Sequence, residues 1–87
     1  MRASGKQFAS ITVEGAHIPL CYRLFEHTEA GVSHYGVSVE NERTGEFSHV
    51  EDVTTRREHA EQLLSLLARG QVTTVSLREI VEDFVAE

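Results

Sequence analysis

The chain has 87 residues, of which 40% are hydrophobic and 25% are charged, an ordinary composition for a single globular domain. Its formal net charge is −6, and its 8 Lys and Arg residues are scattered. This argues against a nucleic-acid partner and against an anionic membrane surface, because both need clustered basic side chains. We expect one domain over residues 1–87, with residues 1–6 flexible.

The first half of the chain alternates apolar and polar residues, as strands with one buried face do. The alternation predicts four strands, centred on residues 9–13, 18–24, 35–39 and 47–53. Turns are predicted at Gly15, at 28–31 and at 41–45, and Gly36 is expected to mark a bulge or a close backbone approach. Such short connections require an antiparallel meander, because parallel neighbours need a long crossover.

The two faces of the predicted sheet differ in polarity. One face carries nearly all the aliphatic side chains. The other carries Ser10, Thr12, Arg23, Ser38 and Glu40. A sheet with one apolar face needs a second layer to cover it.

The second half of the chain has the period of helices and predicts that cover. Two stripes follow the spacing i, i+3, i+4, i+7: Ala60, Leu63, Leu64 and Leu67, and then Leu77, Ile80, Val81 and Phe84. Capping boxes are predicted at Thr55–Glu58 and at Ser76–Glu79, with Thr73 as a competing cap and Gly70 at the C′ position. The sequence therefore predicts an α+β fold, a four-stranded antiparallel meander covered on one face by two C-terminal helices.

Three features of the chain resemble a small family of clostridial-type bacterial proteins of unknown function. They are the Tyr35-Gly36-Val37 strand start, the acidic end of the next strand before a helix, and the closing segment 72–84 with its Val-Glu-Asp-Phe helix. The resemblance covers mainly the last two-thirds of the chain. It implies a strand meander followed by two helices, and it transfers no activity and no functional residue.

The histidines are the first candidates for chemistry, and the chain holds five: His17, His27, His34, His49 and His59. None shows the short paired spacing typical of zinc ligands. His34 and His49 lie on adjacent predicted strands and would meet across the hairpin if the register permits. We expect no metal site and no cofactor.

The lone cysteine and the carboxylates have simpler interpretations. Cys21 lies in mid-strand, away from any helix N-terminus, and is interpreted as a small buried hydrophobic residue rather than a nucleophile. Several carboxylates share part of the last helix and indicate a solvated face or, less often, an acidic docking surface: Glu79, Glu82, Asp83 and Glu87. We expect no catalytic residue.

These observations favour a non-enzymatic protein-interaction or regulatory module. A lone thiol without an export signal favours the cytoplasm. The alternative is a small-ligand-binding domain or minor enzyme, with a cleft between sheet and helices near Tyr22, Tyr35 and a histidine. We also hypothesise a homodimer through a sheet edge or the open face, because exposed edges invite pairing and a small core benefits from a partner.

Overall fold

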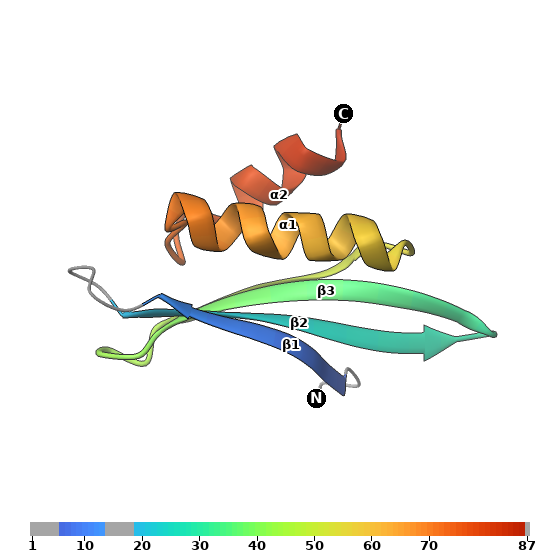
Figure 1. The fold of residues 1–87 in the computed structure, drawn as a ribbon, viewed down its shortest axis with the longest axis horizontal. Helices are drawn as coiled ribbons and strands as arrows, with labels where there is room; N and C mark the ends of the chain where they lie inside the picture. The colour runs from blue at the N-terminus through green and yellow to red at the C-terminus, as the bar shows by residue number, and fades with distance from the viewer. Residues whose placement is uncertain (1–5, 14–18, 87) are drawn as a thin grey trace.

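The computed structural model describes residues 6–13 and 19–86 and consists of one antiparallel sheet followed by two helices (Figure 1). The strands lie in the order of the sequence: β1 (Lys6–Val13), β2 (Leu20–Glu29), β3 (Val32–Asn41) and β4 (Phe47–Thr54). The helices are α1 (Arg57–Gly70) and α2 (Leu77–Val85). The predicted α+β meander with two C-terminal helices is confirmed.

The N-terminal expectations fall partly outside the described residues. The turn predicted at Gly15 and residues 1–5 of the segment expected to be flexible lie there. Lys6, the last residue of that segment, is the first residue of β1.

Two tight turns hold the central hairpins together. Ala30 and Gly31 both have positive φ angles, 53° and 80°, and they join Glu29 directly to its partner Val32. This is the two-residue turn whose twist matches that of the flanking strands. The next turn uses Gly45 at φ 81°, with its N–H donating to the Asn41 carbonyl at 2.7 Å.

A bulge in β4 explains Gly36, as its position in the strand predicted. The pairing of β3 with β4 shifts between Tyr35 and Val37, and Asp52 opposite this shift has a φ of 54°. A Cβ on Gly36 would lie 2.9 Å from the Val50 carbonyl oxygen. The close approach of the β4 backbone therefore excludes a side chain here.

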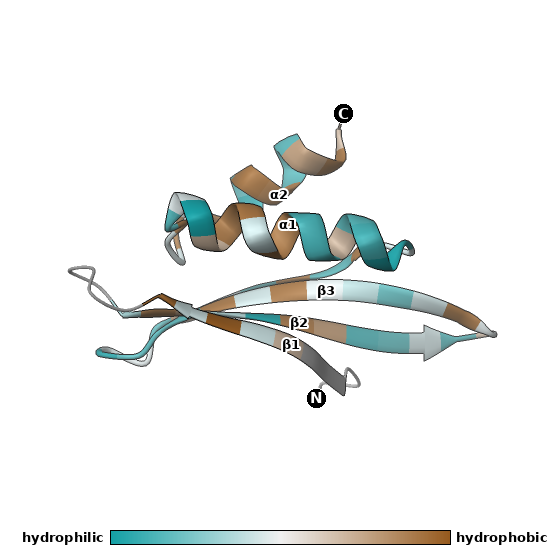
Figure 2. Cartoon of the chain, in the orientation of Figure 1, coloured by the Kyte–Doolittle hydropathy of each residue, from teal (hydrophilic) through white to brown (hydrophobic). Residues whose placement is uncertain are grey.

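The hydrophobic core lies between the sheet and the helices (Figure 2). Helix α1 contacts all four strands, whereas α2 contacts β4 and α1. The predicted burial of Leu63, Leu64 and Leu67 is confirmed, and these side chains pack on the β2 and β3 side chains that point toward the helices. Ile80 and Phe84 are only partly buried, because they lie at the margin of the core.

Aromatic and polar contacts fasten the two helices to each other and to the sheet. The rings of His59 on α1 and Phe84 on α2 lie 4.5 Å apart between centroids. His59 Nδ1 also lies 3.4 Å from the Thr54 hydroxyl at the end of β4. His59 is thus a packing residue where three elements meet.

The helix ends differ from the predicted capping motifs. Helix α1 begins after Arg56 rather than Thr55, and no side chain caps it. Thr54 accepts the Arg56 N–H at 3.1 Å instead, so the polar contact stabilises the preceding bend. Ser76 does occupy the N-cap position of α2, but without a side-chain hydrogen bond.

The end of α1 also lies one residue later than predicted. The left-handed residue is Gln71 at φ 51°, and Gly70 is still helical. Among the described residues, no helix combines the length and the apolar character needed to cross a membrane.

Candidate functional site: the open face of the sheet

The open face is the side of the sheet opposite the helices, and no described element covers it (Figure 1). The register brings its side chains together from all four strands: Ser10, Thr12, Cys21, Arg23, Phe25, His27, His34, Ser38, Glu40, Phe47 and His49. All five polar residues predicted for this face lie on it, with Ser10 and Thr12 on the edge strand β1. The predicted difference between the two faces is therefore confirmed.

An ion pair occupies the centre of the open face. Arg23 donates from Nη1 to Glu40 Oε1 at 2.9 Å, diagonally between β2 and β3. The hydrogen bond to Glu40 raises the pKa of Arg23, so the guanidinium stays charged. Both side chains are only partly exposed. Because their charges are opposite, the pair leaves the centre of the face without net charge.

Two small side chains are buried around this pair. Cys21 is buried and its Sγ lies 3.6 Å from the Thr12 hydroxyl, consistent with the small buried residue predicted. Ser38 is wholly buried, and among the described side chains its Oγ is buried without a hydrogen-bond partner. The larger neighbours cover both residues, so neither thiol nor hydroxyl is presented to solvent.

Two histidines form a pair at one end of the open face. His27 and His34 are direct partners in the β2–β3 register, and their ring centroids are 6.1 Å apart. Each ring lies near a carboxylate: His27 Nε2 is 3.4 Å from Glu29, and His34 Nδ1 is 3.7 Å from Asp52. This end of the face therefore alternates imidazoles with exposed carboxylates.

The register does not bring His34 to His49. His49 lies opposite Ser38, in the regular register that runs from the Glu40–Phe47 pair to the Val37–Val50 pair, four positions along β3 from His34. Within the described part of the chain, no three His, Cys, Asp or Glu side chains are arranged to hold a metal ion. His17 lies outside the described residues, and the expected absence of metal stays a prediction.

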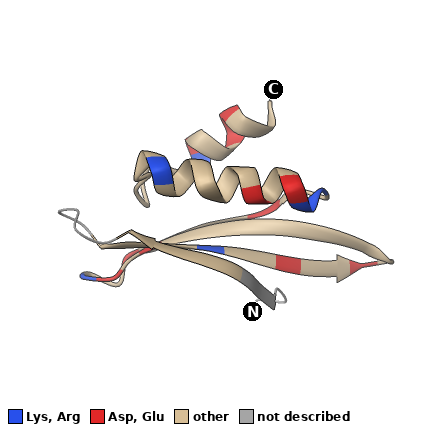
Figure 3. Ribbon diagram, viewed as in Figure 1, with Lys and Arg blue, Asp and Glu red and all other residues tan. Residues whose placement is uncertain are grey.

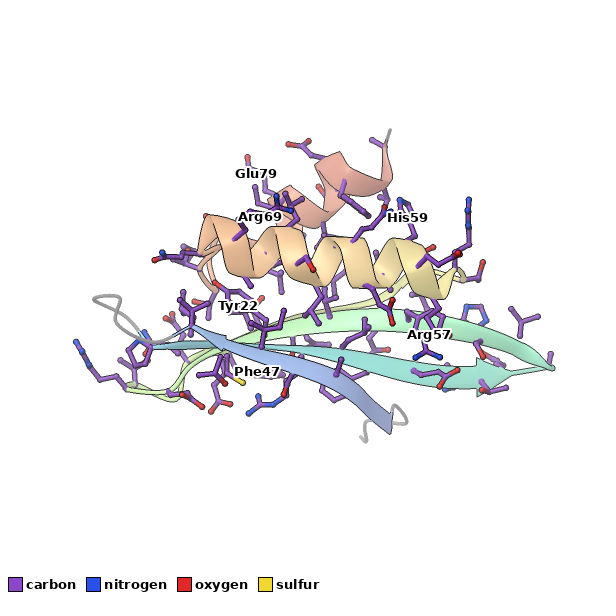
Figure 4. All side chains as sticks on the ribbon, viewed as in Figure 1. Tyr22, Phe47, Arg57, His59, Arg69 and Glu79 are labelled. Atoms are coloured by element: carbon purple, nitrogen blue, oxygen red, sulfur yellow. The ribbon has the colours of Figure 1, made fainter. Side chains whose placement is uncertain are left out.

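An aromatic pair lies at the other end of the open face. The ring of Phe47 lies 5.6 Å from the His49 ring, and Phe47 is 53% exposed. Figure 4 places Phe47 on the side of the sheet away from the helices, whereas Tyr22 points toward α1. An exposed aromatic next to a neutral ion pair is the kind of surface that protein partners bury.

The space between sheet and helices, where the alternative function needed a cleft, is filled at the two tyrosines. Tyr22 is wholly buried, and its hydroxyl donates to the Val72 carbonyl at 2.8 Å. Tyr35 is also buried, with its hydroxyl 3.3 Å from Glu26 Oε2. Both side chains contribute to the core, and both hydroxyls have partners within the chain.

Tyr22 is expected to ionise only in strong alkali. Burial raises the pKa of Tyr22 from its ordinary value of 10 to about 12. A raised pKa means that the folded chain favours the neutral phenol, so this stabilisation is complete below pH 10 and is lost as the pH approaches 12. Ultraviolet titration of tyrosinate should show a late component that disappears in Tyr22→Phe. Two tyrosines that both titrate at the ordinary value in the folded protein would contradict this.

The carboxylates of the last helix form a separate surface. Glu79, Glu82 and Asp83 are exposed on α2, as predicted for a solvated face, and Glu87 lies outside the described residues. Figure 3 shows these acidic positions on the helical layer, on the opposite side of the molecule from the open face. They do not contribute to the candidate site.

A family model described as "Family of unknown function (DUF6514)" matches residues 6–87. The chain belongs to this family. The match begins in β1 and includes both helices, so it extends well beyond the last two-thirds that carried the resemblance in the sequence. No curated protein and no solved structure matches the chain.

Membership of this family leaves the function to be argued from the surface, where one residue had not been singled out. Phe47 was treated as an ordinary strand residue, although alternation along its strand places it on the same face as His49. Phe47 faces Glu40 across the hairpin, and Phe25, which alternation places on the face of Cys21 and Arg23, faces Gly36. An aromatic at a position that alternation assigns to the polar face is the signal that would have found Phe47.

Proposed function

We propose that this protein is a small, non-enzymatic module of the bacterial cytoplasm, of clostridial-type origin, that binds a protein partner through the open face of its sheet. One observation carries the proposal. The helices bury one face of the sheet, and the other exposes Phe47 beside a neutral Arg23–Glu40 pair. Regulation of the bound partner is the role that such a module would serve.

The charge of the open face favours a particular kind of partner. Its rim carries exposed carboxylates, Glu29, Asp52 and Glu51, each within 3.7 Å of a histidine. The whole chain carries a formal charge of −6. The complementary partner is a protein surface with an apolar side chain to cover Phe47 and Lys or Arg side chains to face the rim.

The arrangement of reactive groups supports binding rather than catalysis. Cys21 is buried next to a threonine, and the open-face histidines lie beside exposed carboxylates on a sheet surface. A nucleophile needs a base within hydrogen-bond reach and a site for the reacting group. The alternative, a small-ligand domain, is less favoured because Tyr22 and Tyr35 are packed in the core.

Replacing Phe47 with serine is expected to weaken capture of the partner strongly. The tagged protein is used as bait in the native host, and a candidate is then purified and titrated against wild type and variant. Phe47→Ser should weaken binding at least about tenfold, the loss of a central aromatic contact. Higher salt should also weaken binding, because charges on the rim are exposed to screening.

Val75→Ser is the matched control. Val75 is 84% exposed in the segment between α1 and α2, so the same loss of apolar surface occurs away from the open face. Both variants should melt close to wild type. A partner that binds Phe47→Ser as tightly as wild type, or that crosslinks to the helices instead of to β2–β4, would contradict the proposal. So would turnover of a small molecule at the open face.

A further inference from the structure

We propose that the free edge of β1 pairs antiparallel with β1 of a second copy of this chain, giving a symmetric homodimer with one continuous sheet. The surface is distinct from the centre of the open face, so this dimer does not depend on the function proposed above. Strand β1 is the first strand in the order β1-β2-β3-β4, and β2 is its sole strand neighbour among the described residues.

The two edges of the sheet differ in their protection against pairing. Strand β4 carries Glu51 and Asp52 at a bulge and is contacted by α2. Charge, bulges and helical cover are the means by which proteins block an edge. Strand β1 also has a register shift, between Gln7 and Ala9, but residues 9–13 pair regularly with β2 and contain no charged residue and no proline. The edge of β1 is therefore unprotected over residues 9–13.

The core is incomplete along β1. Ala9, Ile11 and Val13 point toward the helical layer and remain only partly buried, whereas Leu20, Tyr22 and Leu24 opposite them on β2 are fully buried. If β1 of a second copy pairs with this strand, its own apolar side chains extend the row across the seam, the contact between the two β1 strands. Burial of such side chains is the main favourable term in association.

The sequence of β1 is complementary to itself in one antiparallel register. If Ile11 pairs with Ile11 of the second copy, Ala9 pairs with Val13 and Ser10 with Thr12. Each pair then has both members on the same face of the sheet, so both copies keep their helices on one side. No charge opposes a like charge, although each chain carries −6 overall. The matching of residues 9–13 with themselves, without repulsion between the two strands, is why we take a second copy as the occupant.

The pairing makes a specific prediction for exposed residues. Ser10 and Thr12 are both exposed, so Ser10→Lys combined with Thr12→Lys leaves the core intact. In the proposed register each position 10 faces position 12 of the second copy, so these substitutions place two positive charges opposite each other at both pairs. The wild-type mass should rise from one chain toward two between about 1 µM and about 1 mM, the range for an interface of modest size. The lysine variant should remain monomeric.

Gln62→Lys combined with Ser65→Lys adds the same charge on exposed positions of α1 and should leave the dimer unchanged. A third variant, Ser10→Glu with Thr12→Glu, should also be monomeric alone. Mixed with the lysine variant it should form a heterodimer, because opposite charges then face each other. The amide resonances of residues 9–13 should shift on dilution of the wild type.

Three results would overturn the proposal. One is a wild-type protein that stays monomeric over the whole concentration range. Another is a lysine variant that dimerises as well as wild type. The dimer contact would then lie on a different surface, and the edge of β1 would be free to pair with a different protein. The last is the failure of the oppositely charged variants to associate. None of these depends on Phe47, so the partner-binding proposal stands or falls separately.

Discussion

Leu64→Ala should destabilise the domain by about 2–5 kcal/mol, the cost of removing a buried leucine side chain and leaving a cavity. Leu64 is 4% exposed on the face of α1 that packs on the sheet. For a domain of this size the melting temperature should fall by at least about 8 °C. A stability margin of roughly 5–15 kcal/mol makes such a loss a large fraction of the total.

Leu66→Ala is the matched control within the same helix. Leu66 is 40% exposed, so the same truncation there removes less buried surface and should change stability much less than at Leu64. Urea denaturation followed by circular dichroism measures both variants. Equal losses at the two positions, or a Leu64 variant that melts within a degree or two of wild type, would show that the helical layer is not packed as described.

The fold was predictable because its two periods are well separated along the chain. Alternation up to Val53 indicates strands, and the helical stripe from Ala60 indicates the cover. Short connections then leave a meander as the arrangement that fits. The positive φ angles of Gly31 and Gly45 follow from their residue type, whereas Ala30 at φ 53° adopts a conformation that alanine rarely takes.

Register and helix ends were less predictable. Alternation says which face a residue occupies and not which residue it faces. The turn between β3 and β4 sets a register that places His49 opposite Ser38, and alternation does not specify that register. The capping box of α1 requires the helix to start at one particular residue, and a start after Arg56 rather than Thr55 removes it. At α2 the start is as predicted, but Ser76 has a helical backbone, φ −98° and ψ −7°, instead of the extended one from which an N-cap side chain bonds the first turn.

The candidate site was hidden because no local motif encodes it. Its central residues come from three strands: Arg23 from β2, Glu40 from β3 and Phe47 from β4. They become neighbours only after the register is known. The sequence suggested an interaction module because its charge and motifs argue against nucleic-acid binding, a metal site and catalysis. The structure adds a specific surface, the open face, on which that hypothesis can be tested.

Gly36→Ala should destabilise the domain by about 1–3 kcal/mol, the usual cost of forcing extra atoms into a packed region. The added Cβ would lie 2.9 Å from the Val50 carbonyl oxygen and 3.2 Å from Glu51 Cα. Both are backbone atoms, so the strain must be relieved by moving β3 and β4 apart rather than by rotating a side chain.

Gly70→Ala provides a control with the same chemical change and the opposite expected sign. Its Cβ would meet Val72 Cγ2 at 3.7 Å, an ordinary contact, and Gly70 is helical. Alanine in a helix is favoured over glycine by roughly 0.5–1 kcal/mol, so this variant should match or exceed wild type. Thermal melts of the two variants side by side test the close approach directly. If Gly36→Ala is as stable as Gly70→Ala, the β4 bulge does not hold its backbone against Gly36, and the register shift between Tyr35 and Val37 is not packed as described.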